Sequence, residues 1–273
     1  MDADSHTPLN ADAIGALLPF ARRIGRPLLV LGETTSTNDE AARLGREGAP
    51  EGAVIFAERQ TSGRGRLSRR WESPPRRGLW FSLLLRPAFA QAGWTRLTTW
   101  AAVGIARGLE EALPGCHAAV KWPNDIYLGG KKAVGILCES AMGPGGYAVV
   151  GIGVNVNQAR ADFPEELRER ATSLREAAGP DAAPLDRHAA AAALLRQLDA
   201  LYPALERDFA AVVAEAQARS LLIGRSLTVH APSETYAATA EALEPDGSLR
   251  VRCAADGTIR RVSGGEVSIS GWQ

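Results

Sequence analysis

Residues 121–137 of this 273-residue chain read Lys-Trp-Pro-Asn-Asp-Ile-Tyr-Leu-Gly-Gly-Lys-Lys-Ala-Val-Gly-Ile-Leu. Apolar runs on both sides of the Gly129-Gly130 pair predict a strand–turn–strand corner. All three lysines of the chain fall in this stretch, whereas arginine takes every other basic position. Because lysine is a compact point charge and arginine a planar fork, the placement favours a site that needs the smaller cation over a chance cluster in an arginine-biased composition.

The chain on either side of this corner predicts one mixed sheet flanked by helices, an α/β fold. Short apolar runs predict strands at residues 27–31, 53–57, 79–85, 119–122, 126–128, 133–139 and 147–156. Apolar residues at helical spacing predict helices at residues 11–24 and 97–113, and Asn38 is a candidate N-cap for a helix through Arg46. The alanine-rich residues 185–220 predict a long helix or a bent pair.

The pattern changes to β-branched runs after Ile223, which predicts a second, smaller domain. Five strands are expected, at residues 226–230, 236–243, 249–253, 258–262 and 267–269. Turn sequences such as Pro245-Asp246-Gly247 separate them, as in a small all-β barrel. We therefore divide the chain into a catalytic α/β domain over residues 1–221 and a β-barrel domain over residues 222–273.

Composition limits the possible partners. The 31 basic and 31 acidic residues balance, so no global field steers the protein toward nucleic acid or an anionic membrane. The three cysteines are far apart and include no Cys-x-x-Cys pair, which indicates reduced side chains. No signal sequence or membrane-length apolar run is present. We expect a cytoplasmic protein that binds neither nucleic acid nor a membrane.

A long basic loop links two of the expected strands. Residues 59–77 hold seven arginines and one acid, Glu72, around the sequence Gly63-Arg64-Gly65-Arg66. Glycine lets backbone N–H groups approach an anion, and arginine grips it with two donors, so the loop suits a lid over a phosphate. Arginine–glycine runs also occur in RNA-binding segments, which leaves an RNA-binding module as an alternative.

Two common nucleotide-binding motifs are missing. Neither Gly63-Arg64-Gly65 nor Gly151-Ile152-Gly153 is followed by the third glycine of a dinucleotide fingerprint. Gly130-Lys131 is followed by Lys132 instead of Ser or Thr, and Asp125 stands where a P-loop has its first glycine. A nucleotide would have to be bound in another way.

The corner sequence closely resembles the central motif of biotin–protein ligases. Four further blocks in the same order are similar to that family: residues 35–38, 58–71, 151–157 and 171–174, with residues 264–268 fitting its C-terminal barrel. The resemblance implies a catalytic domain with the class II aminoacyl-tRNA synthetase-like fold and an SH3-like barrel. It also implies that biotin is activated with ATP and Mg²⁺ to biotinyl-5'-AMP and transferred to a lysine of a biotin carboxyl carrier domain of a carboxylase.

The family includes monomers and homodimers, and some members carry an N-terminal helix-turn-helix domain and repress transcription. Only about thirty residues precede the first expected strand of this chain, too few for such a domain. We therefore expect a ligase without operator binding.

The resemblance also implies roles for individual residues. Lys132 and Arg66 would act catalytically on the biotin carboxylate and the α-phosphate. The implied biotin-binding residues are Ser36, Thr37, Asn38, Gln60, Gly63, Arg64, Gly65, Arg66, Trp71, Lys132 and Gly135. The implied ATP-binding residues are Arg66, Asn124, Asp125 and Asn155, with Asp125 also a candidate Mg²⁺ ligand.

Several residues have a structural alternative. Ser36, Thr37 and Asn38 suit a helix N-cap, which can coexist with ligand contact. Trp122 before Pro123 suits packing, and Asp125 suits an ion pair with a neighbouring lysine. Lipoate or octanoyl transfer is the nearest enzymatic alternative to biotin transfer.

Overall fold

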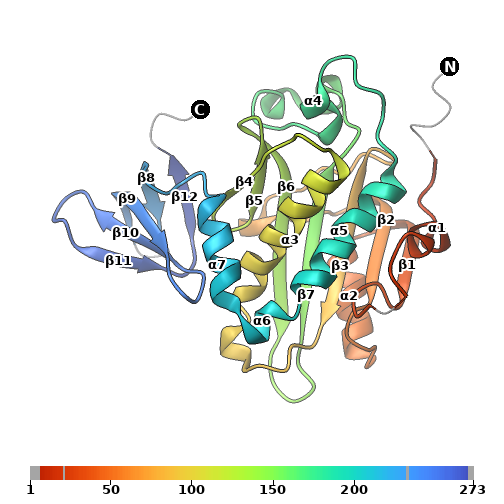
Figure 1. Cartoon of the computed structure of the whole chain (residues 1–273), viewed down its shortest axis with the longest axis horizontal. Helices are drawn as coiled ribbons and strands as arrows, with labels where there is room; N and C mark the ends of the chain where they lie inside the picture. Colours follow the sequence, from red (N-terminus) through yellow and green to blue (C-terminus); the bar gives the residue numbers. More distant parts are fainter. Residues whose placement is uncertain (1–6, 21, 232–233, 270–273) are drawn as a thin grey trace.

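The computed structural model describes residues 7–20, 22–231 and 234–269. Its larger sheet has seven strands in the order β1-β2-β3-β7-β6-β5-β4 (Figure 1). Only β1 and β2 run parallel, and every other neighbouring pair is antiparallel. The strands are β1 (Leu28–Thr34), β2 (Val54–Gln60), β3 (Gly78–Leu85), β4 (Ala118–Lys121), β5 (Asp125–Leu128), β6 (Lys131–Ala141) and β7 (Tyr147–Asn155). The predicted mixed α/β fold is confirmed.

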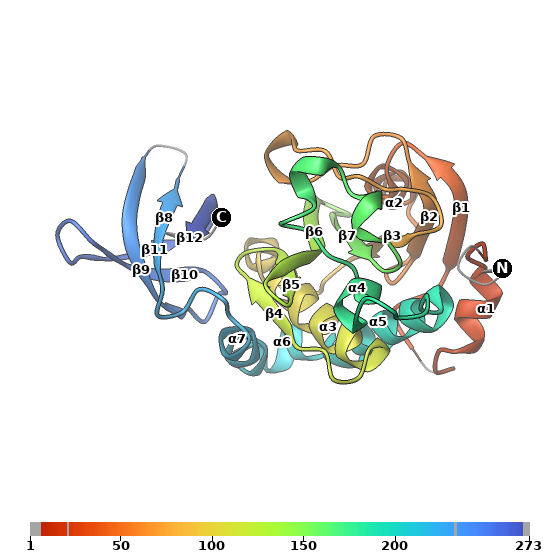
Figure 2. The same ribbon diagram turned by 90° about the horizontal axis from the view of Figure 1, so that it is seen from above.

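Helices cover both faces of this sheet, as the view from above shows (Figure 2). The helices are α1 (Ala11–Ala16), α2 (Thr37–Arg46), α3 (Arg96–Ala112), α4 (Leu174–Ala178), α5 (Arg187–Leu201), α6 (Ala204–Arg207) and α7 (Phe209–Ala218). Alternate residues of β2 point to opposite faces, so Phe56 belongs to the main core with α3 and α5, while Ile55 joins a smaller core with Ala41 of α2. No helix among the described residues is long and apolar enough to cross a membrane.

The C-terminal strands form a separate antiparallel sheet in the order β11-β10-β9-β8-β12. They are β8 (Ser226–His230), β9 (Thr235–Leu243), β10 (Leu249–Cys253), β11 (Ile259–Val262) and β12 (Glu266–Ile269), which confirms the five expected strands. A turn of this sheet is fastened to the larger sheet, because the indole Nε1 of Trp122 donates to the carbonyl of Gly247 at 3.0 Å. The expected domain boundary after residue 221 falls between α7 and β8.

Proline explains where two helix predictions were wrong. The helix expected over residues 11–24 ends at Ala16, before Pro19, which lacks a backbone donor and disfavours helical geometry in the residue before it. The long helix or bent pair expected over residues 185–220 is instead three helices, α5, α6 and α7, with Pro203 directly before α6. Of the candidate caps of α2, Ser36 is confirmed and Asn38 is not: Ser36 Oγ accepts from the Asn38 N–H at 3.3 Å.

Candidate functional site

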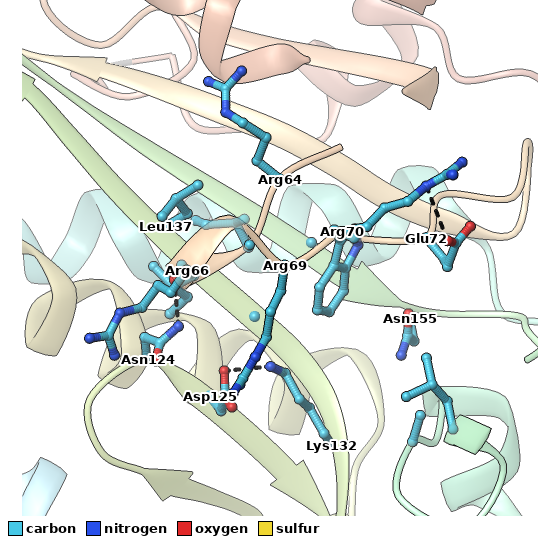
Figure 3. A pocket seen from close by; sticks show the side chains of 18 of the residues that line it. Arg64, Arg66, Arg69, Arg70, Glu72, Asn124, Asp125, Lys132, Leu137 and Asn155 are labelled. Carbon is cyan, nitrogen blue, oxygen red and sulfur yellow. Dashed lines mark hydrogen bonds and ion pairs between the residues drawn. The ribbon is translucent and has the colours of Figure 1, made fainter. Parts of the chain in front are cut away.

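One cavity of about 690 Å³ lies among the long basic loop, the start of α2, the corner before β5, and strands β6 and β7. Every residue that the sequence implied for ligand binding lines it except Gly63 (Figure 3). Gly63 lies behind the wall, where its carbonyl accepts from the Trp71 N–H at 2.9 Å. A Cβ at Gly63 would lie 2.6 Å from the Trp71 carbonyl oxygen, so only glycine fits there.

A buried polar network forms the end of the cavity at α2. Gln60 Oε1 accepts from the backbone N–H of Thr37 at 2.9 Å and from its hydroxyl at 3.2 Å. The amide of Asn38 is engaged on both sides: its oxygen accepts from Ser82 at 2.6 Å, and its nitrogen donates to Glu139 at 2.6 Å. Satisfied buried polar groups hold one geometry, so this end of the cavity is pre-arranged. Ser36 is both the cap of α2 and part of the cavity wall.

Trp71 forms the apolar wall by lying on two glycines of the sheet. A Cβ at Gly135 would lie 2.7 Å from Trp71 Cζ3, and one at Gly153 would lie 2.5 Å from the same indole. Neighbouring strands place these two glycines side by side, since Gly135 of β6 pairs with Gly153 of β7. The indole also meets the Trp80 ring edge-on, with centroids 6.3 Å apart. Both glycines are required because any side chain there would displace the indole.

The corner before β5 brings two lysines and one carboxylate together. Lys132 Nζ lies 2.7 Å from Asp125 Oδ1 and 5.4 Å from the centre of the Trp71 ring. Lys121 Nζ lies 5.7 Å from the centre of the Tyr127 ring. Burial lowers the pKa of Lys121, an effect that Asp125 opposes and Lys132 reinforces. The corner therefore places two lysines of the cavity lining near one carboxylate, and the ion-pair alternative for Asp125 is observed.

The arginines of the basic loop point in different directions (Figure 3). Arg64 reaches outward to Asp39, with N–O distances of 2.8 and 2.9 Å, and to Glu139 at 3.3 Å. Arg66 donates to Asn124 Oδ1 at 3.1 Å and to the Gly265 carbonyl at 2.7 Å. The loop is thus fastened to α2 and β6 on one side and to the C-terminal sheet on the other.

Arg69 adds a second link between the loop and the C-terminal sheet. Its two terminal nitrogens each lie 2.7 Å from an oxygen of Glu266. The hydrogen bonds from Arg69 lower the pKa of Glu266. This bidentate pair lies at the rim of the cavity, since both residues line it.

Asn155 is held at the far end of the cavity. Its nitrogen donates to the Thr172 carbonyl at 3.0 Å, and its oxygen accepts from Gln158 at 3.0 Å. The segment that supplies Thr172 also begins α4, which Ser173 caps through the Glu176 N–H at 3.1 Å. The resemblance over residues 151–157 and 171–174 thus corresponds to two segments in direct contact.

Sequence reasoning missed several residues of this site. Ser82 and Glu139 complete the network around Asn38, Gln158 fixes Asn155, and Glu266 binds Arg69. Ser82 is a lone polar residue in the apolar strand of residues 79–85, which is the one local signal available for it. Gln158 lies only three residues from its partner Asn155, whereas Glu139 and Glu266 depend on contacts between distant segments.

No group of three or more His, Cys, Asp or Glu side chains suited to a metal ion occurs among the described residues. Asp125 therefore offers one carboxylate, which is ion-paired with Lys132. Mg²⁺ is commonly held by one or two carboxylates together with substrate phosphates. The site fits a magnesium ion that arrives with a nucleotide better than one held by protein ligands alone.

Comparisons with known proteins agree with one another. Residues 31–157 match the model of the biotin/lipoate A/B protein ligase family. The chain is similar to the biotin--[acetyl-CoA-carboxylase] ligase of Mycobacterium tuberculosis, with 36% identity over 76% of either chain. It is also similar to the bifunctional ligase/repressor BirA of Bacillus subtilis, with 45% identity over 57% of this chain and 48% of that protein, so it spans about half the length of that relative.

Solved structures give the same result. The structure of biotin protein ligase from Aquifex aeolicus in complex with biotin and ATP superposes with a TM-score of 0.75 and 30% identity. The match covers 89% of this chain and 97% of the Aquifex chain.

Proposed function

Because this chain belongs to the biotin/lipoate A/B protein ligase family, we propose that it is a biotin–protein ligase. It would join biotin to ATP, release pyrophosphate, and pass the biotinyl group from biotinyl-5'-AMP to a lysine of a biotin carboxyl carrier domain. The observation that carries this proposal is the single cavity in which a pre-arranged polar end, an aromatic wall and a cluster of cations occur together. Its volume of about 690 Å³ lies within the range usual for small-molecule sites.

The polar end suits the ureido ring of biotin. Thr37, Gln60 and Ser36 present hydroxyl and amide groups there, and the N–H groups around Arg64 lie on the loop above. A buried urea whose donors and acceptors were unpaired would be strongly disfavoured, so these groups would discriminate against analogues lacking that edge. Asn38 would act mainly by orienting this end, because its amide is already hydrogen-bonded on both sides.

The cation cluster suits the activation step. The biotin carboxylate attacks the α-phosphorus of ATP, a new P–O bond forms, and pyrophosphate leaves with the electron pair of the bond that breaks. Negative charge increases on the α-phosphate oxygens, where Lys132 and Arg66 would stabilise it more than they stabilise the separated substrates. Asp125 fixes the Lys132 ammonium, and Arg66 would have to leave its Asn124 and Gly265 partners to reach the phosphate.

ATP would occupy the part of the cavity lined by Asn124, Asp125 and Asn155. Mg²⁺ bound with the nucleotide would neutralise phosphate charge, and Asp125 would supply a carboxylate to hold it. The basic loop, already fastened at Asp39 and Glu266, would cover the adenylate and keep water from hydrolysing it.

The proposal includes the partners and the organisation of the chain. The acceptor would be the carrier domain of a biotin-dependent carboxylase such as acetyl-CoA carboxylase, and the protein would act as a monomer or a homodimer. The catalytic domain would extend to residue 221, with the C-terminal sheet as a separate domain. Cytoplasmic location and the absence of operator binding remain predictions.

Biotin-dependent exchange between ATP and pyrophosphate tests the function. Purified protein should catalyse exchange with biotin and magnesium, and it should label an added carrier domain. Exchange that depends on lipoate instead would assign the protein to the lipoate branch of the same family. Exchange with neither acid, measured on folded protein, would rule out an adenylating ligase.

A further inference from the structure

A second cavity, of about 200 Å³, adjoins the main one where the C-terminal sheet meets the start of α3. Six residues line both cavities: Arg66, Trp122, Pro123, Asn124, Ile136 and Leu137. The shared wall therefore includes the arginine and the asparagine assigned above to the acyl phosphate. A group in the second cavity would therefore adjoin the residues proposed to contact the acyl phosphate.

The shared wall is closed by hydrogen bonds of Arg66. Its guanidinium donates to Asn124 Oδ1 at 3.1 Å and to the Gly265 carbonyl at 2.7 Å. Gly265 belongs to the C-terminal sheet, so the two parts of the protein meet at this side chain. If Arg66 turns toward a phosphate in the main cavity, both bonds break and the wall between the cavities opens.

The rest of the second cavity is lined mainly by hydroxyl groups. Thr95, Thr98 and Thr99 come from the start of α3, and Ser248 and Ser263 from turns of the C-terminal sheet. Among the described residues that line it, Arg66 is the only basic one. Such a lining accepts hydrogen bonds from an amine without repelling it strongly.

The carboxylate at this cavity would not trap an ammonium group. Asp246 accepts from Arg261 at 2.6 Å and from the Ser248 hydroxyl at 2.7 Å, so its charge is already compensated. A volume of about 200 Å³ lies below the range usual for small-molecule pockets. It is therefore a poor fit for biotin or a nucleotide but suits one long, narrow side chain.

We propose that this second cavity admits the lysine side chain of the acceptor protein to the biotinyl carbonyl. The inference rests on the proposed function, because it requires an acyl-adenylate in the main cavity. The flexible four-carbon stem of lysine would lie along the threonines of α3, with its amine at the wall that Arg66 forms. The acceptor domain would then contact the start of α3 and the turns of the C-terminal sheet together.

At this wall the acceptor amine would replace AMP on the acyl carbon. The acceptor ammonium first loses a proton to water, and the lone pair of the amine attacks the acyl carbon. A C–N bond forms while the bond from the acyl carbon to the phosphate oxygen breaks, and AMP leaves with that electron pair. The nitrogen then releases a second proton to water, which gives a neutral amide.

Filling the second cavity should separate the two half-reactions. Two variants, Ser263→Trp and Thr98→Phe, each fill the cavity from a different side. In each, biotin-dependent ATP–pyrophosphate exchange should stay within about twofold of the parental rate. Single-turnover transfer to a carrier domain should fall about tenfold or more. Cleavage of the bound adenylate by hydroxylamine should stay near the parental rate, because that nucleophile is small. Ala255→Trp is the matched control, since Ala255 lies in an exposed turn of the same sheet and lines neither cavity.

These measurements can contradict the proposed lysine route. The assignment would be overturned if both filled variants transferred biotin at the parental rate. It would also be overturned if exchange and transfer fell in parallel while the melting temperature was unchanged. Loss of transfer in Ala255→Trp as well would show that the whole sheet surface matters and would also overturn it. A parent protein without biotin-dependent exchange would instead refute the proposed function, and this inference with it.

Discussion

At the scale of single residues, Lys132 is the clearest test of the chemistry. Lys132→Gln removes the cation but keeps a side chain of similar length, so adenylate formation should fall about 10²–10³-fold. The melting temperature should change little, because Lys132 is a partly exposed residue with one ion pair. Lys131→Gln is the matched control, since Lys131 pairs loosely with exposed Glu169 at 3.8 Å. Equal exchange rates in both variants would remove Lys132 from the mechanism.

The glycines beneath Trp71 give a second residue-scale prediction. Gly153→Ala would place a Cβ 2.5 Å from the indole, so Trp71 must shift and the apolar wall changes shape. We expect about 1–3 kcal/mol of lost stability and weaker biotin binding by calorimetry. Gly32→Ala should do neither, because a Cβ there meets nothing within 4 Å. Unchanged biotin affinity in Gly153→Ala would mean that Trp71 does not form the wall.

At this scale the sequence predicted which residue types surround the ligand but not all their partners. Gly135 was implied to bind biotin, and the structure shows it directly beneath Trp71, with Gly153 beside it. That contact depends on the register between β6 and β7, which a linear motif does not contain. Glu139 and Glu266 were missed because their partners lie far away in the sequence: Glu139 binds Asn38 and Arg64, and Glu266 binds Arg69.

At the scale of elements, the Arg64–Asp39 pair fastens the basic loop to α2. Asp39→Asn should loosen the loop, raise KM for biotin about two- to fivefold and leave kcat nearly unchanged. This range corresponds to an exposed ion pair that contributes up to about 1 kcal/mol. Glu33→Gln is the matched control, because Glu33 also forms an exposed pair, with Arg59 at 3.0 Å on neighbouring strands. A parental KM in Asp39→Asn, with Asp39→Glu also unchanged, would show that the loop needs no such fastening.

Strands were predicted more closely than helices in this chain. The strands at residues 226–230 and 249–253 were located to the residue, and the others within a few residues, because short apolar runs are bounded here by glycine, proline and charged turns. The helix over residues 11–24 was too long because its apolar spacing continues past the point where Pro19 makes the helix unfavourable. Local backbone chemistry outweighed the pattern there.

At the scale of the whole molecule, a buried ion pair connects distant parts of the chain. Arg187 of α5 lies 2.8 Å from Glu58 of β2, and both side chains are largely buried. Glu58 also accepts from the Leu9 N–H, and Arg187 donates to the Thr7 carbonyl at 2.7 Å. One pair thus joins the N-terminal segment, the sheet and the main helical layer.

This pair predicts how stability depends on pH. Burial alone would raise the pKa of Glu58, but hydrogen bonds from Arg187 and from the Leu9 N–H outweigh it and hold the pKa below the ordinary value of 4.5. A lowered pKa in the folded state gives stability that is fully present above the unfolded value and is lost as pH falls through the folded value. Glu58→Gln should therefore cost about 3–5 kcal/mol near neutral pH.

The same variant should be less sensitive to acid than the parent. Denaturant unfolding between about pH 6 and pH 3 should show a smaller loss of stability in Glu58→Gln, because the group that takes up the proton is missing. Glu47→Gln, at an exposed pair with Arg43, should follow the parental curve. Parallel curves for the parent and Glu58→Gln would exclude Glu58 as a source of acid sensitivity.

The confinement of lysine to one corner would have a chemical consequence if the protein makes an acylating agent, as proposed. A mixed anhydride that escapes its pocket modifies any free side-chain amine nearby, and the molecule that produced it is the first one it meets. Guanidinium groups stay protonated at neutral pH and are poor nucleophiles. With arginine at every other basic position, only Lys121, Lys131 and Lys132 offer such an amine, and the last two are paired with carboxylates. The surface is thereby protected from damage by its own product.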